Sequence, residues 1–283
     1  MSFFQRFDEI NPKVIYLIMA VALIAPVLRP IGMPITITEQ LTTPVFRWIE
    51  NLNPGDVVFF DSAYSGGSDS ELGPQLAAWF YHCMKKGVKV VGVSQWADGA
   101  PLAYATLTRV AAEAEKDGYS AKEGIDWVYV GYKAGGVSIW RGMQTDFGKA
   151  CAYQDYNGVD FSKLPLIQRV KAWDKSTKGL IVFSSGSPGV PTYTTYFPDY
   201  EIYVGNVAVQ VAGSMSLLRS GQVKGVLAGL RGAAEYEKLL GRPGSATKLM
   251  DAQSLGHLII IALIILGNVA HISKKRKSRA NVA

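Results

Sequence analysis

Two apolar segments frame the chain, and the one near its C-terminal end is the stronger. From Leu255 to Ile272 there is no acidic or permanently basic side chain. A helix of that length is about 27 Å long, close to the hydrocarbon thickness of about 30 Å in a bilayer. Five Lys and Arg residues follow between Lys274 and Arg279, which marks a cytoplasmic side. The pattern predicts a transmembrane helix and a basic cytoplasmic tail over residues 254–283. A buried core helix is disfavoured because it would show a polar face.

The first apolar segment, from Val14 to Leu28, is shorter, and two hypotheses fit it. Its length suits the core of a cleaved signal peptide as well as a short membrane helix. Pro26 lies where small residues would define a cleavage site, and Arg29 follows directly. We therefore favour an uncleaved transmembrane helix within residues 1–33. With two spans in the cell (plasma) membrane, both termini are expected to be cytoplasmic and the chain between them extracytoplasmic.

A short amphipathic helix is predicted in the juxtamembrane connector, residues 34–55. Thr43 and Pro44 suit the N-cap and the first position of a helix, and Trp48 belongs to its apolar face. Pro54 and Gly55 end the connector. This helix could lie on the membrane surface or pack beneath the domain that follows.

Residues 56–253 alternate between short apolar runs and segments with helical periodicity. The predicted strands are Val57–Phe60, Val88–Val93, Trp127–Tyr132, Leu180–Phe183 and Glu201–Val204. The last of them is short, which suits an edge of the sheet. The predicted helices are Glu71–Lys86, Leu102–Lys116, Gln144–Ala152, Leu164–Trp173 and Gln222–Leu240. This order predicts one extracytoplasmic α/β domain with a mainly parallel, doubly wound (Rossmann-like) sheet of about five strands.

Three glycines recur along the last predicted helix of this domain. Gly225, Gly229 and Gly232 would form a stripe of small residues on one face. Glycine costs about 1 kcal/mol relative to alanine inside a helix, so such a stripe favours a packing role. The contact could be helix against sheet or helix against another subunit.

The charge distribution argues against nucleic-acid binding. The chain carries 29 Lys and Arg against 23 Asp and Glu, a formal net charge of +6. The termini account for the whole excess, because residues 34–252 contain 21 residues of each sign. A nucleic-acid-binding domain needs a basic patch on its folded surface. We therefore expect no nucleic acid among the partners.

Neither the cysteines nor the histidines indicate a metal or cofactor site. Cys83 lies in a helical pattern and is expected to be a buried free thiol, although a bridge to Cys151 stays open. His82, His257 and His271 lack metal-ligand spacing. We expect no metal and no cofactor.

Polar residues follow four of the predicted strands at their carboxyl ends. In an open parallel sheet these ends meet at one edge, where ligands bind. The candidate ligand-binding residues are Asp61, Ser62, Tyr64, Ser94, Trp96, Asp98, Tyr132, Lys133, Ser184 and Ser185. Their carboxylates, hydroxyls, amine and aromatic rings suit a small polar ligand. The same loops would be rich in Gly, Ser and Asp for turn formation and helix capping alone, so both explanations stay open.

A catalytic role for these residues is the weaker hypothesis. Its sharpest form is a serine hydrolase in which Asp61 or Lys133 assists a strand-end serine such as Ser184. The sequence has no Gly-x-Ser-x-Gly motif, and the domain's histidine, His82, lies within a predicted helix. Its glycine-rich loops match no phosphate-binding motif.

Two functional hypotheses follow. The favoured one is a membrane-anchored α/β domain that acts as a non-catalytic subunit of a membrane protein assembly, either a homo-oligomer or a complex with related membrane subunits. The alternative is a membrane-anchored hydrolase or small polar ligand-binding protein that uses the carboxyl ends of the sheet. The sequence leaves enzymatic activity undecided, and the lipid bilayer is the partner that it indicates most strongly.

Overall fold

The computed structural model describes residues 11–174 and 176–280, with residues 273–280 as backbone only. The chain forms two compact units. One runs from Ile35 to Ala246 and has an α/β fold. The other combines the described residues before and after it and contains two helices.

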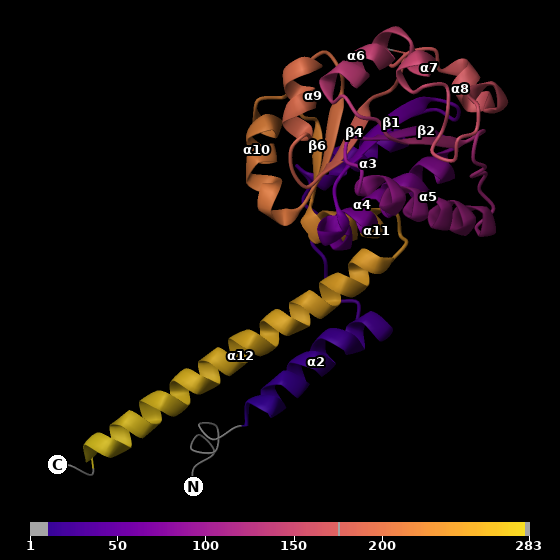
Figure 1. Cartoon of the computed structure of the whole chain (residues 1–283). Coiled ribbons are helices and arrows are strands. Elements are labelled where there is room, and N and C mark those ends of the chain that lie inside the picture. The colour runs from indigo at the N-terminus through magenta and orange to yellow at the C-terminus, as the bar shows by residue number, and fades with distance from the viewer. Residues whose placement is uncertain (1–10, 175, 281–283) are drawn as a thin grey trace. The chain divides into compact units, whose positions relative to one another are not determined.

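Six parallel strands form one sheet in the α/β unit (Figure 1), in the order β3-β2-β1-β4-β5-β6. The strands are β1 Val57–Ala63, β2 Lys89–Ser94, β3 Trp127–Tyr132, β4 Leu180–Ser184, β5 Ile202–Asn206 and β6 Gly225–Ala228. The strand order reverses between β1 and β4, as in a doubly wound sheet. The predicted parallel α/β fold is confirmed, whereas the predicted count of five strands was too low.

Helices cover both faces of this sheet (Figure 1). One face is covered by α3 Thr42–Glu50, α4 Asp69–Lys86, α5 Gly99–Lys116 and α11 Gly229–Leu239. The other face is covered by α6 Val137–Thr145, α7 Phe147–Ala150, α8 Pro165–Arg169, α9 Val190–Tyr196 and α10 Val211–Arg219. Three short 3-10 helices, η1 Gly66–Ser68, η2 Phe161–Lys163 and η3 Ala208–Gln210, connect these elements.

Consecutive residues of β1 enter different cores. The Phe60 ring lies 5.7 Å from that of Trp79 on α4, and the Phe59 ring lies 5.7 Å from that of Phe147 on α7. Because helices cover both faces of the sheet, the strand is a continuous apolar run rather than an alternating one. Such runs are why the first four strands could be located from the sequence.

The connector helix α3 packs within the α/β unit. Val45 and Ile49 are fully buried, and the Trp48 ring stacks on Tyr203 of β5 at 4.1 Å. Trp48 Nε1 also donates a hydrogen bond to the Lys178 carbonyl at 2.6 Å. Of the two locations left open for this helix, the structure shows the packed one.

The segment predicted as a single helix from Gln222 to Leu240 is a strand followed by a helix. Residues 225–228 form β6, whose Val226 pairs with Val204 of β5. The helix α11 begins only at Gly229, where φ is +58°. That left-handed backbone turns the chain sharply and cannot lie inside a continuous helix. The predicted helix was therefore too long at its start. Because β6 lies beyond β5, the predicted position of β5 at an edge was also wrong.

The three glycines consequently share no helix face. A Cβ atom at Gly225 would lie 2.8 Å from Val45 Cγ2, and one at Gly232 would lie 2.6 Å from the Leu227 carbonyl carbon. At Gly229 it would lie 2.8 Å from the carboxylate of Glu71. All three glycines are contacted by other parts of the α/β unit. The predicted small-residue stripe is thus replaced by close packing within the fold.

The helices between β3 and β4 also differ from the predicted ones, Gln144–Ala152 and Leu164–Trp173. Asp146 has extended backbone and its carboxylate accepts a hydrogen bond from the Lys149 N–H at 2.9 Å. It therefore starts α7 as an N-cap and separates it from α6. The last helix, α8, ends at Arg169 because Val170 is extended.

Cys83 and Cys151 are both buried free thiols. They belong to the cores on opposite faces of the sheet. The sheet therefore separates them, which rules out a bridge, and the favoured prediction of free thiols is confirmed.

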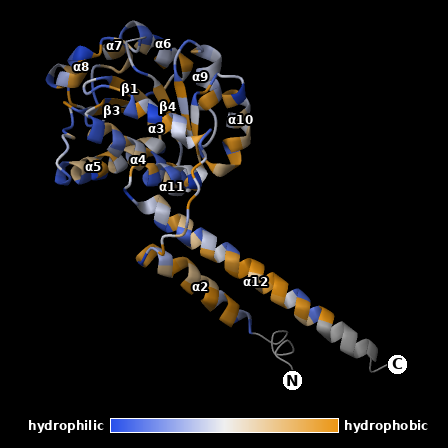
Figure 2. Cartoon of the chain, turned by 180° about the vertical axis from the view of Figure 1, so that it is seen from behind, coloured by the Kyte–Doolittle hydropathy of each residue, from blue (hydrophilic) through white to orange (hydrophobic). Residues whose placement is uncertain are grey.

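The second unit contains α2, Pro12–Leu28, and, from Thr247 on, α12, Ser245–Ala280, both rich in apolar side chains (Figure 2). Among the described residues, α12 is the one helix long and apolar enough to cross a membrane, over Ser245–Ile272. α2 is a shorter apolar helix of 17 residues. The structure therefore contains one candidate span by length and composition, where the sequence predicted two.

Asp251 of α12 holds the segment that follows α2. Its carboxylate accepts the backbone N–H groups of Ile31 and Gly32 at 2.9 and 2.8 Å and that of Met33 at 2.9 Å. The side chain of Asp251 is fully buried. One turn further along, a Cβ at Gly256 would lie 3.2 Å from Leu23. Within this unit, α12 therefore contacts both α2 and the turn after it.

Candidate ligand-binding site

Four of the predicted site residues lie at the carboxyl ends of strands but inside the protein. Asp61, Ser62, Ser94 and Ser184 are each at most 1% exposed. Their polar groups must therefore be satisfied by neighbouring protein groups. Those partners show what each side chain does.

Asp61 accepts three hydrogen bonds in the interior. Its carboxylate lies 2.7 Å from the Tyr193 hydroxyl and 3.0 and 3.1 Å from the backbone and side-chain nitrogens of Gln95. Burial raises the pKa of the Asp61 carboxyl to about 7, although the hydrogen bonds from Tyr193 and Gln95 lower it. These contacts join β1, the loop after β2 and α9. Asp61 thus binds elements of the fold together.

The hydroxyls of Ser62 and Ser94 also bind neighbouring elements. Ser62 Oγ lies 2.7 Å from the hydroxyl of Tyr129 on β3. Ser94 Oγ lies 2.8 and 2.6 Å from the carbonyl oxygens of Ser62 and Trp96. Both hydroxyls therefore form hydrogen bonds between neighbouring strands and loops, and these bonds satisfy their polar atoms in the interior.

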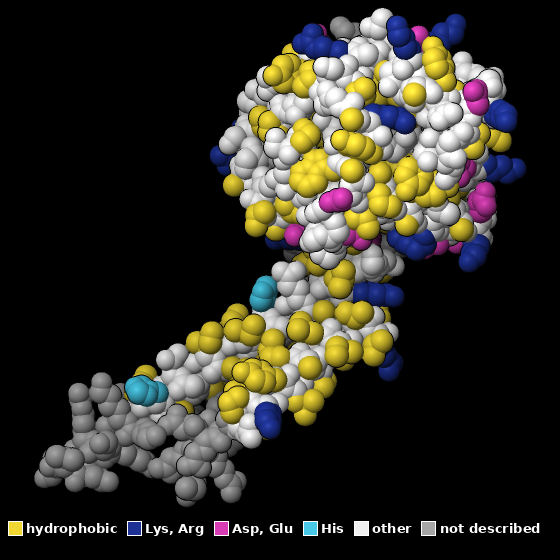
Figure 3. Space-filling view, in the orientation of Figure 1, with side chains coloured by type: hydrophobic (Ala, Val, Ile, Leu, Met, Phe, Trp, Pro, Cys, Tyr) yellow, Lys and Arg dark blue, Asp and Glu magenta, His cyan; other side chains and the backbone are white. Residues whose placement is uncertain are grey.

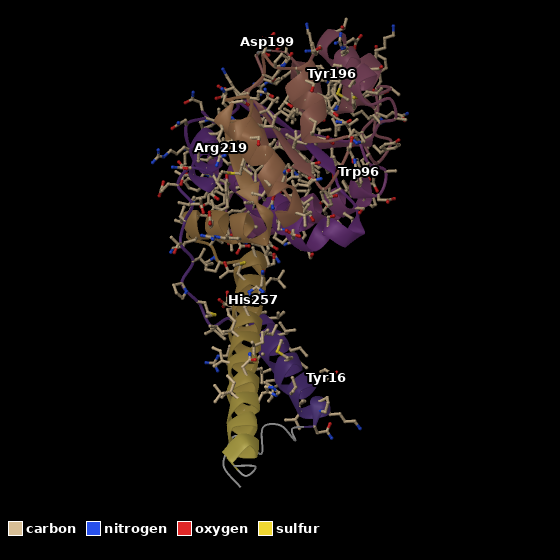
Figure 4. The ribbon with its side chains drawn as sticks, turned by 90° about the vertical axis from the view of Figure 1, so that its left-hand side faces the viewer. Tyr16, Trp96, Tyr196, Asp199, Arg219 and His257 are labelled. Carbon is tan, nitrogen blue, oxygen red and sulfur yellow. The ribbon has the colours of Figure 1, made fainter. Side chains whose placement is uncertain are left out.

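Trp96 covers the point where the strand order reverses. Its indole Nε1 donates a hydrogen bond to the Pro188 carbonyl in the loop after β4 at 2.9 Å. Gly186 of the same loop lies against the ring, where a Cβ would come within 2.8 Å. Figure 4 labels Trp96 at the margin of the α/β unit. Ligands commonly bind at this switch point in doubly wound sheets; here an indole ring spans it.

The remaining predicted residues differ in their burial. Tyr64 is fully buried, Asp98 is exposed and Tyr132 is 44% exposed. Lys133 follows β3, three strand positions from β4 in the sheet. At about 4.8 Å per position, its backbone lies roughly 14 Å from that of Ser184. Lys133 is therefore badly placed to activate the Ser184 hydroxyl, which instead donates to the Gly186 carbonyl at 3.0 Å.

A cavity of about 580 Å³ lies at the carboxyl ends of β4 and β5. Its walls come from the loop after β4, the start of α9, the end of β5 and the segment from η3 into α10. Val190, Pro191 and Leu217 are among its apolar lining residues, and Asn206 and Ser214 are among its polar ones. Of the residues predicted from the sequence, only Ser184 lines this cavity.

Asn206 is a lining residue of the cavity with a buried side-chain amide. The residue is 2% exposed, and its side-chain Nδ2 donates to Ser214 Oγ at 2.5 Å. Its backbone carbonyl accepts from Gln75 Nε2 at 3.0 Å, which fixes the end of β5. The side-chain Oδ1 has no partner among the described atoms.

The sequence contained a signal for Asn206 that the prediction missed. Ser184 and Asn206 are direct neighbours in the register of β4 and β5, each at the last position of its strand. The predicted fifth strand ended at Val204, two residues too early. Extending it to Asn206 would have placed this amide on the same sheet edge as Ser184. Ser214 lies in a helix that was not predicted.

The described residues contain no group of three His, Cys, Asp or Glu side chains that could hold a metal ion. The histidine of the α/β unit, His82, is buried between Tyr236 and Glu50, at 2.8 and 2.9 Å. Burial lowers its pKa to about 4. It is therefore a neutral structural side chain far from the cavity in the fold, on the opposite face of the sheet.

Comparisons with protein-family models, with curated proteins and with solved structures gave no match to this chain. Function is therefore inferred from the geometry of the site.

Proposed function

We propose that this protein is a membrane-anchored, non-catalytic ligand-binding protein, and that its α/β unit binds a small molecule in the cavity beside Asn206. The cavity of about 580 Å³, with its mixed apolar and polar lining, carries this proposal. Its position supports the proposal too, because ligands of open α/β sheets bind beyond the carboxyl ends of the strands.

The hydrogen bonds of the candidate catalytic residues favour binding without catalysis. Asp61 is enclosed by Tyr193 and Gln95, and the Ser184 hydroxyl donates to its own loop. A nucleophile needs a base within hydrogen-bond reach. The hydrogen bonds of the Ser184 hydroxyl go to Gly186 and not to Asp61 or Lys133, so binding without chemistry fits the geometry better than hydrolysis.

Membrane anchoring is the second part of the proposal. Large apolar side chains are exposed along α2 and α12, including Leu17, Ile24, Ile261 and Ile265 (Figure 3). Exposed apolar surface on this scale is typical of contact with lipid. We place both helices in the plasma membrane with both termini cytoplasmic and the α/β unit extracytoplasmic. The contact of Gly256 with α2 supports inserting them as a pair.

Assembly with copies of itself or with related membrane subunits stays a separate prediction. It drew on a glycine-striped helix that the structure replaces with β6 and α11. The mass of the detergent-extracted protein tests it directly, since a monodisperse monomer at micromolar concentration would contradict it.

The binding proposal is tested by screening a library of small neutral and charged molecules against the full chain in nanodiscs, using ligand-observed NMR. Gly213→Leu provides the blocked site, because Gly213 lines the cavity and no atom lies within 4 Å of its Cβ position. Ser216→Leu adds the same side chain at an exposed position of the same helix.

We expect a set of molecules that bind the original protein and the Ser216→Leu variant but not the Gly213→Leu variant. If no bound molecule is sensitive to Gly213→Leu while both variants remain folded, the cavity is not a ligand site and the proposal is wrong.

A further inference from the structure

We infer that Trp96, which is not a lining residue, positions one wall of the cavity beside Asn206 and thereby regulates binding there. This wall is formed by residues 184–191, the wall segment. The hydrogen bond between Trp96 and the wall segment and the occupation of the cavity stabilise each other. This inference rests on the proposed function and concerns the regulation of that same site.

The wall segment makes up one side of the cavity. It runs from the last residue of β4 into the first residues of α9. Its lining residues are Ser184, Gly186, Ser187, Val190 and Pro191. The other lining residues come from the end of β5 and from η3 and α10. A displacement of the wall segment would therefore change the shape of the cavity.

The Trp96 side chain holds the middle of the wall segment. Its indole Nε1 donates a hydrogen bond to the Pro188 carbonyl at 2.9 Å. Its ring also lies directly against Gly186, where a Cβ atom would come within 2.8 Å of the ring carbon Cη2. A glycine at this position lets the ring pack closely against the backbone. The two contacts join the loop after β2 to the wall of the cavity.

The backbone that carries Trp96 is firmly held. The Trp96 N–H donates to Ser94 Oγ at 3.2 Å, and the Trp96 carbonyl oxygen lies 2.6 Å from the same hydroxyl. The preceding residue, Gln95, donates from its backbone to the Asp61 carboxylate at 3.0 Å and from its side chain to the Tyr193 hydroxyl at 2.6 Å. We therefore expect movement at the Trp96 contact to occur in the wall segment, which has the cavity beside it.

The cavity makes the position of the wall segment sensitive to occupation. Where the wall segment borders the cavity of about 580 Å³, its atoms lack protein packing partners. A molecule in the cavity would supply those contacts and favour the position in which Pro188 is bonded to Trp96. Coupling of this kind is reciprocal, so loss of the Trp96 hydrogen bond would weaken binding by the same factor.

A covalent occupant tests this coupling without a known ligand. Gly213→Cys is modified with benzyl methanethiosulfonate, because Gly213 lines the cavity and has open space at its Cβ position. Ser216→Cys, modified in the same way at an exposed position of the same helix, is the matched control. Cys83 and Cys151 are fully buried and should not react. Nuclear Overhauser effects from the benzyl protons to the Leu217 methyl groups show that the benzyl group lies in the cavity.

The exchange of the Trp96 indole proton with water is measured by NMR on the full chain in nanodiscs. The Trp96 signal is assigned by its absence from Trp96→Phe, and the signals of the fully buried Trp140 and Trp173 show whether each variant is folded. Exchange requires the hydrogen bond to open, so its rate reports the open population. We expect the benzyl group on Gly213→Cys to slow this exchange by at least about fivefold. The benzyl group on Ser216→Cys should leave the rate unchanged.

Gly186→Ala breaks the contact from the other side. The added Cβ would force the Trp96 ring and the wall segment apart and weaken the hydrogen bond to Pro188. We expect Gly186→Ala to speed exchange of the Trp96 proton by about fivefold or more and to remove the effect of the benzyl group. Gly67→Ala is the matched control, because its Cβ position in the loop after β1 is open. It should change neither the exchange rate nor the effect of the benzyl group.

Two outcomes overturn the inference about Trp96 alone. One is a benzyl group that contacts Leu217 without slowing the exchange of the Trp96 proton, and the other is a benzyl effect that persists in full in Gly186→Ala. A benzyl group on Gly213→Cys that does not contact Leu217 would contradict both this inference and the proposed function. If the coupling is observed but the library screen yields no Gly213-sensitive molecule, only the proposed function is wrong.

Discussion

Asp61 shows how burial and hydrogen bonding together set the properties of one side chain. An aspartate placed in a protein core without partners would be strongly destabilising in its charged form. Three donors from Gln95 and Tyr193 compensate part of that cost, yet burial remains the larger effect on its pKa. The carboxyl therefore changes charge near neutral pH, unlike an exposed aspartate.

The protonation of Asp61 makes stability depend on pH. The carboxyl pKa is raised from 3.8 to about 7 by folding, so between these values the folded protein holds a proton that the unfolded chain releases. Stability from this group is therefore fully present below pH 3.8 and is lost as pH rises towards 7. We expect the original protein to lose on the order of 3 kcal/mol relative to Asp61→Asn between pH 4 and pH 8.

Denaturant unfolding of the full chain in detergent at several pH values measures this difference. Asp98→Asn, at an exposed aspartate of the next loop, is the control and should follow the original protein. A difference between Asp61→Asn and the original protein that is constant with pH, or that grows in the opposite direction, would contradict the assignment.

At the scale of elements, α11 organises the edge of the α/β unit. Glu235 on this helix is 2% exposed and accepts hydrogen bonds from Thr38 Oγ1 at 2.8 Å and Thr42 Oγ1 at 2.6 Å. Glu237 accepts the backbone N–H groups of Gly244 and Ala246 at 2.8 and 2.9 Å. One helix thereby holds both the first and the last residues of the unit. The first residues of α11 also pack closely against β6, where Gly232 contacts Leu227.

Gly232→Ala tests whether the glycines serve this packing. A Cβ at Gly232 would lie 2.6 Å from the Leu227 backbone, which cannot move without disturbing β6. We expect Gly232→Ala to lower the unfolding free energy by about 1–3 kcal/mol and to leave the mass of the detergent-solubilised protein unchanged. Gly213→Ala is the matched change, because its Cβ position is open and alanine favours a helix. Thermal unfolding measures the stability of each variant, and light scattering measures the mass of the detergent-solubilised protein. A Gly232→Ala variant with altered mass and unaltered stability would instead indicate that Gly232 lies in a contact between subunits.

At the scale of the whole molecule, the apolar helices and the α/β unit have surfaces of different polarity. Large apolar side chains are exposed along α2 and α12, whereas basic and acidic side chains are interspersed over the face of the α/β unit seen in Figure 3. A protein with these two surfaces is expected at a membrane boundary. Which side the α/β unit occupies is a question of topology.

Cysteine labelling tests the proposed topology. Cys83 and Cys151 are fully buried, so an added exposed cysteine should dominate the reaction with a membrane-impermeant maleimide. Lys116→Cys, exposed at the end of α5, is expected to react in intact cells. Ala283→Cys, at the C-terminal end of the sequence, should react only after permeabilisation. The reverse pattern would place the α/β unit in the cytoplasm.

The sequence alone located what depends on local runs of residues. Continuous apolar stretches such as Leu180–Phe183 could hardly be anything but buried strands, and the long run in α12 needed no tertiary context. The regular helices α4 and α5 were visible for the same reason, since their periodicity recurs over several turns. These strands and helices depend on the residue types of neighbouring positions, which the sequence shows directly.

Only the tertiary structure decided the rest. Residues 225–228 form a strand because β5 supplies their hydrogen-bond partners, and four residues with a glycine carry too weak a local preference to show it. The charge behaviour of Asp61 depends on Tyr193, which lies far along the chain. The cavity beside Asn206 exists because α9, α10 and two strand ends leave space between them. Contacts between distant segments create sites of this kind, so no local pattern can report them.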